Sequence, residues 1–257
     1  MSYENIIVQI GDDYIAEVTL NRPNNLNAFN VPLAEELDKA FKELDENSLV
    51  RVIILKGAGK AFCAGIDISD FSNKTEYRNW IECMENPLIT ISRMKKPVIA
   101  QVHGVAAANG AGLVAAADIA IAAENARMGL TAIKVGLNCI GPVIPVVRSV
   151  GRKRALELLF FGEMISATEA LNMGLINRVV PAADLESETR KWASNLAKKS
   201  PLALQIAKKA FYVAENMDYY KAFEYMNEVF ARLCSTEDAK EGICAFFEKR
   251  NPQWKER

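Results

Sequence analysis

Two short runs of apolar, mostly β-branched residues constrain the fold of this chain more than any other feature. Residues 52–55 read VIIL and Val98–Val102 read VIAQV, and glycine or proline lies close to both. Such runs are typical of parallel strands that are covered on both faces. Between them, residues 76–94 have a helical pattern, with a break expected at Asn86 and Pro87. Strand, glycine turn, helix and strand in this order predict a βαβ sheet of the α/β class.

The flanking segments predict a hairpin at the N-terminus and helices at the C-terminus. Two β-rich segments, Ile6–Ile10 and Ile15–Leu20, are separated by a GDD turn. From Val31 onward, apolar residues recur every three or four positions, which predicts an amphipathic helix ending near Asn47. Helical patterns dominate after Gly151, and we divide the chain into a core, residues 1–197, and a helical region, residues 198–257. Amphipathic helices outside a closed core often pack on a neighbouring subunit, so we expect an oligomer.

Composition excludes several classes of partner and location. The chain has 257 residues with Lys+Arg 31 and Asp+Glu 32, a net charge of -1 that would not attract nucleic acid. The first residues lack the basic start and apolar run of a secretory signal, so we expect no export. The longest apolar stretch, residues 110–123, is too short for a membrane span and contains Asp118. The five cysteines have neither metal-ligand nor disulfide spacing. We therefore expect reduced thiols in a cytoplasmic protein, with no metal and no membrane span.

Glycine-containing turns follow both apolar runs, at residues 57–67 and 103–112. In parallel sheets, ligands bind beyond the carboxyl ends of the strands. Neither turn fits the GxGxxG or P-loop pattern, which argues against a dinucleotide or nucleotide-triphosphate site. Backbone amides from the two turns are candidates for an oxyanion hole, assisted by the N-terminus of a helix predicted from Gly110. Close packing alone would also explain the glycines.

Several motifs in order along almost the whole chain resemble the crotonase (enoyl-CoA hydratase/isomerase) superfamily. They are NRP at 21–23, LNAF at 26–29, AFCAGIDI at 61–68, KPVIA at 96–100, HG at 103–104, DIAIA at 118–122, VGL at 135–137, the segment 162–181 and FFEKR at 246–250. The resemblance implies a repeated ββα spiral core with a helical C-terminal trimerisation region. It also implies trimers that often pair into hexamers, and an acyl-CoA thioester as substrate. CoA would then be part of the substrate, with no separate cofactor.

The resemblance assigns roles to individual positions. The backbone N–H groups of Ile66 and Asn109 would form the oxyanion hole, although many members have glycine at the second position. The path of CoA would be lined by Asn24, Leu26, Ala28, Ala64, Ile66, Asp67 and Gly110. Phe246 and Lys249 would reach the nucleotide end of CoA, including that of a neighbouring subunit; a solvated helix charge is the simpler interpretation of Lys249.

The chain departs from the family pattern at the acid and base. Hydratases of this family use two glutamates, and the matching positions here are Gly112 and Ala132. The aspartate of several isomerases and of a dehalogenase would fall near Ile140. None of these three side chains can transfer a proton, so we expect ordinary enoyl-CoA hydration to be slow.

Two other residues are candidates for the missing chemistry. Glu85, on the helix before the second run, would act as a base if an apolar pocket raised its pKa. Cys139, next to Asn138, would be a nucleophile only if a neighbour lowered its pKa. An exposed helix charge and an inert buried thiol are the plainer interpretations. Asp67, Asp70 and His103 are also considered, but structural roles explain them better.

Three functions fit this pattern. The first is an enzyme of enoyl-CoA hydratase/isomerase type that stabilises a thioester enolate without the usual glutamate pair. The second is a decarboxylase of malonyl-type acyl-CoA, a reaction that generates its own enolate and needs no side-chain base. The third is a non-catalytic protein that binds acyl-CoA or a partner subunit.

Overall fold

The computed structural model of the chain describes residues 3–69, 71 and 76–257, and its centre is a six-stranded sheet. The strand order is β1-β2-β3-β4-β6-β9, in which only the β1–β2 pair is antiparallel. These strands are β1 (Ile6–Ile10), β2 (Ile15–Leu20), β3 (Val52–Gly57), β4 (Val98–Val102), β6 (Ile119–Ala123) and β9 (Arg178–Val180). The predicted hairpin and parallel βαβ sheet are confirmed.

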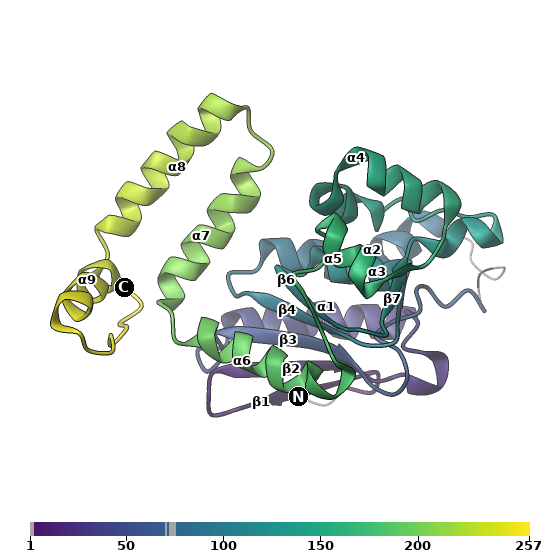
Figure 1. Cartoon of the computed structure of the whole chain (residues 1–257), viewed down its shortest axis with the longest axis horizontal. Coiled ribbons are helices and arrows are strands. Elements are labelled where there is room, and N and C mark those ends of the chain that lie inside the picture. The colour runs from purple at the N-terminus through teal and green to yellow at the C-terminus, as the bar shows by residue number, and fades with distance from the viewer. Residues whose placement is uncertain (1–2, 70, 72–75) are drawn as a thin grey trace.

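Helices surround this sheet and form the C-terminal end of the chain (Figure 1). They are α1 (Val31–Glu46), α2 (Tyr77–Arg93), α3 (Asn109–Ala116), α4 (Val143–Phe161), α5 (Ala167–Met173), α6 (Leu185–Ala197), α7 (Pro201–Ala214), α8 (Tyr219–Cys234) and α9 (Glu237–Glu248). The helix expected from Val31 is confirmed as α1, which begins after the Asn30 cap and has Asn47 as its C-cap. Leu37, Phe41 and other residues on one face of α1 are buried, as an amphipathic helix requires.

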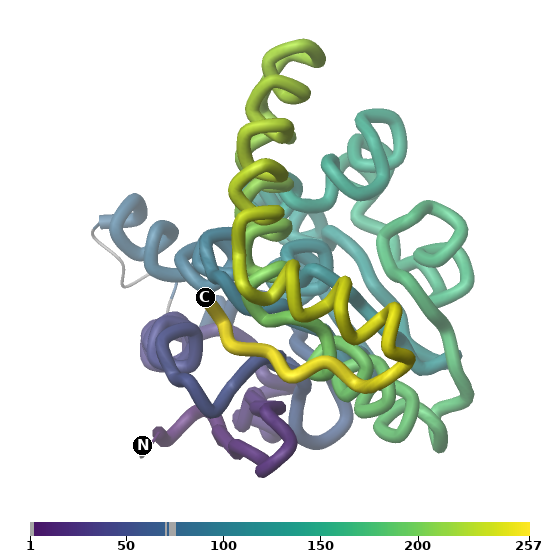
Figure 2. The backbone as a smooth tube through the Cα atoms, turned by 90° about the vertical axis from the view of Figure 1, so that its left-hand side faces the viewer, coloured from purple at the N-terminus to yellow at the C-terminus, as the bar shows by residue number. Residues whose placement is uncertain are grey.

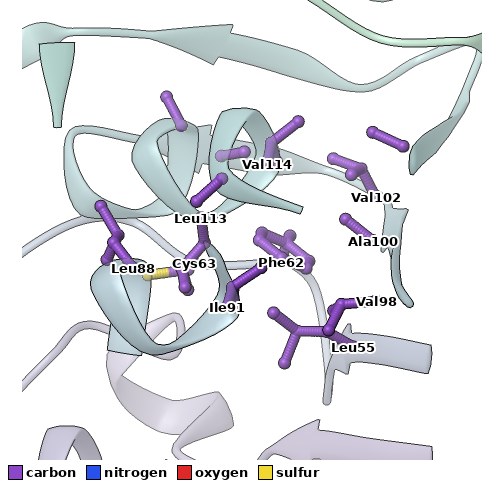
Figure 3. Close-up of a cluster of buried hydrophobic side chains, with 14 of the residues drawn as sticks. Leu55, Phe62, Cys63, Leu88, Ile91, Val98, Ala100, Val102, Leu113 and Val114 are labelled. Carbon is purple, nitrogen blue, oxygen red and sulfur yellow. The ribbon is translucent and has the colours of Figure 1, made fainter. Parts of the chain in front are cut away.

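The two faces of β3 explain its unbroken apolar run. Ile53 and Leu55 belong to the larger core, which α1, α2 and α3 share, whereas Val52 and Ile54 face a second core that α6 covers. Because successive strand residues point to opposite faces, a strand buried on both sides has no polar alternation. Figure 3 shows the larger core, where Leu55 and Phe62 lie among side chains from α2, α3 and β4.

The predicted break in the helix at Asn86 and Pro87 is wrong, because α2 continues through both residues. Proline in a helix removes one backbone hydrogen bond and usually bends or ends the helix. Here Met84, Leu88 and Ile91 are buried in the larger core on either side of the proline. Their packing holds α2 together where the local sequence alone favours an interruption.

A second, three-stranded sheet of order β5-β7-β8 lies beside the main one. Its strands, β5 (Val105–Ala107), β7 (Arg127–Gly129) and β8 (Ile165–Ser166), are too short to carry a readable pattern. Strand β5 lies within the second glycine turn and directly precedes α3. It therefore fixes the start of that helix.

The C-terminal helices form an extended end of the molecule. In Figure 1, α7 and α8 run side by side with α9 beyond them, and Figure 2 shows α8 projecting past the other elements. Helix α7 also packs on α2 of the core. None of the five cysteines is in a disulfide bond, and no helix in the described ranges is long and apolar enough to cross a membrane. Asp70 lies outside the described residues.

Candidate active site

The turns that follow β3 and β4 are in direct contact. The Ala107 N–H donates to the Cys63 carbonyl at 2.9 Å. A Cβ at Gly110 would lie 2.1 Å from the Cys63 oxygen, and a Cβ at Gly65 would lie 3.0 Å from the Ala108 Cβ. The glycines at these two positions allow the backbones to approach, as expected for a site assembled from both turns.

The two proposed oxyanion donors flank this contact and are free. Within the described part of the chain, the N–H groups of Ile66 and Asn109 donate to no acceptor. Asn109 is the first residue of α3, where backbone N–H groups have no helical partner. Ala108 before it has φ 48° and ψ −112°, a backbone conformation that costs a residue with a side chain about 1–3 kcal/mol. This strained peptide sets the direction of the Asn109 N–H.

The Asn109 side chain explains why this position is not glycine. It is buried, and its Nδ2 donates to the Met84 carbonyl at 3.2 Å. The bond ties the start of α3 to the middle of α2. The amide and the side chain of Asn109 thus have separate roles, one facing the proposed oxyanion hole and one holding two helices together.

The positions expected to line the CoA path come together in one loop pair. The Ala64 N–H donates to the Leu26 carbonyl at 3.0 Å, and Leu26 has the left-handed φ of 50°. Asn24 lies beside it in a 3₁₀ turn, Pro23–Asn25. The buried Asn27 side chain supports the loop by donating to the Ala61 carbonyl at 2.8 Å and accepting from a backbone N–H. A loop held by these hydrogen bonds can present backbone groups to a ligand.

Arg22 and Asp67 join the two loops. Arg22 Nη2 lies 3.0 Å from Asp67 Oδ2, and Arg22 Nη1 donates to the Ala28 carbonyl. Hydrogen bonds from Ser69 and Arg22 hold the pKa of the Asp67 carboxyl below its usual range. Asp67 is therefore ionised and engaged in the structure of the loop. Sequence reasoning missed the supporting roles of Arg22, Asn27 and Ala108, because long-range pairing and a positive φ at alanine leave no sequence signal.

The position of the first expected glutamate has little free space. A Cβ at Gly112 would lie 2.8 Å from Leu88 Cδ2 and 2.9 Å from Pro142 Cβ. Ala132, at the second position, lies in a 3₁₀ helix, Thr131–Val135, and packs against the larger core. Ile140, at the expected aspartate position, is 70% exposed.

Cys139 is buried beside Ala132 and is not activated. Burial raises the pKa of its thiol, and a backbone hydrogen bond from Ala132 to the sulfur opposes this effect only in part. Asn138, next to it, accepts the Cys139 backbone N–H at 2.8 Å. A neutral thiol is a poor nucleophile, so the geometry gives Cys139 no support as one.

Glu85 has a different environment. Its side chain is half-buried on α2, and a Cβ at Gly141 would lie only 1.6 Å from its Oε1, so the carboxylate rests on the Gly141 backbone. It has no hydrogen-bond or ion-pair partner among the described residues. Burial, with a smaller contribution from the nearby Glu82 charge, raises the pKa of Glu85.

The remaining candidates lie apart from this site. His103 Nε2 is 3.0 Å from the Gly59 carbonyl and holds the end of β4 against the first turn. Phe246, on α9, is 78% exposed, and Lys249 is the left-handed C-cap of the same helix. Figure 1 places α9 at the far left and α3 in the right half of the molecule. Within one chain, these two residues are therefore not part of the loop cluster.

A groove of about 1170 Å³ separates the core from the C-terminal helices. Its walls come from α2, α3, α4, α7 and α8 and are largely apolar. Of the predicted site residues only Glu85 lines this groove; Ile66, Asn109 and Cys139 do not. Within the described ranges, no group of three or more His, Cys, Asp or Glu side chains is placed to hold a metal ion.

Comparison with known proteins agrees with this architecture. Residues 11–257 match the enoyl-CoA hydratase/isomerase family. The probable enoyl-CoA hydratase echA8 of Mycobacterium bovis is 35% identical over 258 residues, covering 100% of both chains. The short-chain-enoyl-CoA hydratase of Clostridium acetobutylicum is 35% identical over 97% of both chains.

Solved structures give the same result. The enoyl-CoA hydratase of Mycobacterium smegmatis superposes with a TM-score of 0.94 at 35% identity, covering 98% of this chain and 99% of that one. Human enoyl-CoA hydratase domain-containing protein 3 gives a TM-score of 0.94 at 31% identity, over 98% and 100%. The chain therefore belongs to the enoyl-CoA hydratase/isomerase family of the crotonase superfamily.

Proposed function

We propose that this protein is an enzyme that acts on acyl-CoA thioesters by stabilising an enolate. The N–H groups of Ile66 and Asn109 hold the thioester oxygen as negative charge develops on it. The observation that carries the proposal is a pair of free backbone donors on two contacting turns. In other enzymes, loss of one such donor costs about 3–4 kcal/mol of transition-state stabilisation.

CoA binds along the loops on either side of the Leu26–Ala64 hydrogen bond. The lining residues are Asn24, Leu26, Ala28, Ala64, Ile66, Asp67 and Gly110. Asp67 acts through its ion pair with Arg22, which keeps the loops in register. Phe246 and Lys249 are distant from these loops within one chain and serve the CoA of a neighbouring subunit in a trimer or a dimer of trimers.

Hydration of a simple enoyl-CoA is not the main reaction. It requires a base for water and an acid for the α-carbon, and Gly112 and Ala132 supply neither. Relatives carry the name enoyl-CoA hydratase, so this prediction separates the chain from them. Cys139 is a neutral buried thiol and does not supply the missing base or acid.

A panel of CoA thioesters tests the proposal. Crotonyl-CoA, butyryl-CoA and malonyl-CoA are assayed for chemical conversion, and the Tm is measured with each. A ligand at 100 times its Kd stabilises the folded state by about 2.7 kcal/mol, which is an increase in Tm of about 5–10 °C for a chain of this size. We expect stabilisation by the thioesters and slow hydration of crotonyl-CoA.

Each other outcome has a defined meaning. Rapid loss of CO₂ from malonyl-CoA would favour the decarboxylase. Stabilisation without conversion of any thioester would favour the non-catalytic binding protein. Absence of stabilisation by every thioester would overturn the proposal, as would crotonyl-CoA hydration at the rate of glutamate-bearing hydratases.

A further inference from the structure

Glu85 is the one unpaired carboxylate of the groove between the core and the C-terminal helices, among the residues that the structure describes. Two other carboxylates line this groove, and both are paired. Asp118 lies 2.7 Å from Lys208 and Glu215 lies 2.7 Å from Arg148. Glu85 has neither an ion pair nor a hydrogen bond in the described part of the chain. A half-buried carboxylate without a partner is costly to keep, and such groups concentrate at functional sites.

The position of Glu85 follows from contacts that connect α2 to the start of α3. The residue before it, Met84, accepts the side-chain hydrogen bond of Asn109 at 3.2 Å. One helical turn further along each helix, Leu88 of α2 meets Gly112 of α3, where an added Cβ would lie 2.8 Å away. Glu85 directly follows Met84 in α2, so its backbone lies beside the start of α3, and its side chain extends into the groove that faces the C-terminal helices.

The turn after Cys139 leaves space for the Glu85 carboxylate and fills the space beside Gly112. Gly141 has no side chain, and the Glu85 carboxylate occupies the space where a Cβ would be. Pro142, the next residue, closes the space beside Gly112. The chain therefore excludes a side chain from α3 at this point and delivers a carboxylate from α2 instead.

We propose that Glu85 is the base and acid of proton transfer at the α-carbon of an acyl-CoA, the carbon next to the thioester carbonyl. The C–H bond breaks, its electron pair forms the enolate, and the proton forms an O–H bond on Glu85. The N–H groups of Ile66 and Asn109 hold the enolate oxygen. Glu85 then returns a proton to the substrate and is regenerated, so no oxidant or second reactant is consumed. This role depends on the proposed binding of acyl-CoA.

The charges that face Glu85 set the pH range in which it works. Glu82 lies one turn earlier on α2 and adds to the effect of burial, which raises the pKa of Glu85. The other charged groups of the groove are Arg148, Asp118, Lys208 and Glu215, which are paired as described. The ionised base is therefore the major form only at pH values above the usual range for glutamate.

Exchange of substrate protons for deuterium isolates this step. Butyryl-CoA is saturated, so in D₂O the enzyme can only exchange its α-protons, a change that NMR follows. We expect exchange with the wild-type protein, and a decrease of about 10²- to 10⁴-fold in Glu85→Gln, which is nearly isosteric. The matched control is Glu82→Gln, on an exposed residue of the same helix. It should keep the maximum exchange rate that the wild type reaches at high pH. Glu85→Asp, which restores the charge on a shorter chain, should recover part of the exchange.

Thermal stabilisation by butyryl-CoA separates this inference from the proposed function. If butyryl-CoA stabilises both wild type and Glu85→Gln, and both exchange at the same rate, Glu85 is not the base although acyl-CoA binds. The same holds if the wild type binds butyryl-CoA without exchange. If butyryl-CoA does not stabilise the wild type, the proposed function itself fails. A wild-type rate that rises with pH and a flat profile in Glu85→Gln are the expected signature.

Discussion

At the scale of single residues, Asn109 combines a free backbone donor with a side-chain hydrogen bond to the neighbouring helix. Its backbone N–H is free at the start of α3, and its side chain bonds to the Met84 carbonyl. Glycine would keep the free N–H and lose the side-chain hydrogen bond. Proline would lose both, although the first turn of a helix is where proline is best tolerated.

Substitutions at Asn109 separate the role of the backbone N–H from that of the side chain. Asn109→Pro should abolish conversion of the best substrate, because proline removes the proposed oxyanion donor. Asn109→Gly should lower the free energy of unfolding by about 1 kcal/mol through the lost hydrogen bond and change conversion only mildly. Urea denaturation and a rate assay measure the two effects. Unchanged conversion in both variants would show that this amide is not a catalytic donor.

The raised pKa of Glu85 should make the stability of the folded protein depend on pH. The pKa of Glu85 is raised in the folded protein, so the native state binds more protons than the unfolded state between the usual and the raised pKa. Stability therefore falls as pH rises through that window. Glu85→Gln does not ionise, so its Tm should exceed that of the wild type by about 2 °C at neutral pH. The difference should vanish below about pH 4. An equal difference at both pH values would contradict this interpretation.

At the scale of elements, the contact of α2, α3 and the turn at Pro142 decides which chemistry the site can hold. Leu88 and Pro142 occupy the space beside Gly112, so even a methyl group there must displace one of them. A glutamate at this position needs more space still. Substituting glutamates at Gly112 and Ala132 alone would not rebuild a hydratase pair.

A mutant cycle tests this contact. Gly112→Ala should destabilise the protein by about 1–3 kcal/mol through overpacking. Leu88→Ala should cost about 2–5 kcal/mol because it leaves a cavity. Since the added methyl group fills part of that cavity, the double variant should be more stable than the sum predicts by at least about 0.5 kcal/mol. Urea denaturation of the four proteins measures the coupling, and additive effects would show that the two residues do not compete for space.

Much of this element structure is predictable from local patterns, and the remainder depends on contacts between distant residues. The run at 52–55 and the periodicity after Val31 predict β3 and α1, because burial on two faces and on one face leave different patterns. The break predicted at Pro87 is wrong because the packing of α2 outweighs the loss of one backbone hydrogen bond. For the proposed site, family motifs point to Ile66 and Asn109, whose N–H groups donate to no acceptor in the described part of the chain. Two contacts join residues far apart in the sequence, so no local pattern predicts them. They are the bond from the Asn109 side chain to Met84 and the packing of Glu85 on Gly141.

At the scale of the whole molecule, the C-terminal helices differ in how firmly they join the core. Helix α7 is fixed by Lys208, which lies 2.7 Å from Asp118 and donates to the Lys96 carbonyl at 2.8 Å. The Tyr212 hydroxyl adds a bond of 3.1 Å to the same aspartate. Helix α8, in contrast, has no buried residue in this single chain. The expectation that C-terminal helices lie outside the closed core and pack on a neighbouring subunit thus applies to α8 more than to α7.

We predict that the exposed face of α8 is covered in an oligomer. Phe223 and Phe230 lie two helical turns apart on α8 and are 56% and 65% exposed, and exposed apolar surface of this kind is typical of an interface. Light scattering at micromolar concentration should give a mass that is a multiple of one chain. Phe223→Lys with Phe230→Lys should shift the mass toward the monomer, because two charges would be buried in the assembly without partners. Glu224→Gln, an exposed substitution on the same helix, is the control and should leave the mass unchanged. A wild-type protein that is monomeric at this concentration, or a double lysine variant with an unchanged mass, would show that α8 is not the face on which the chains meet.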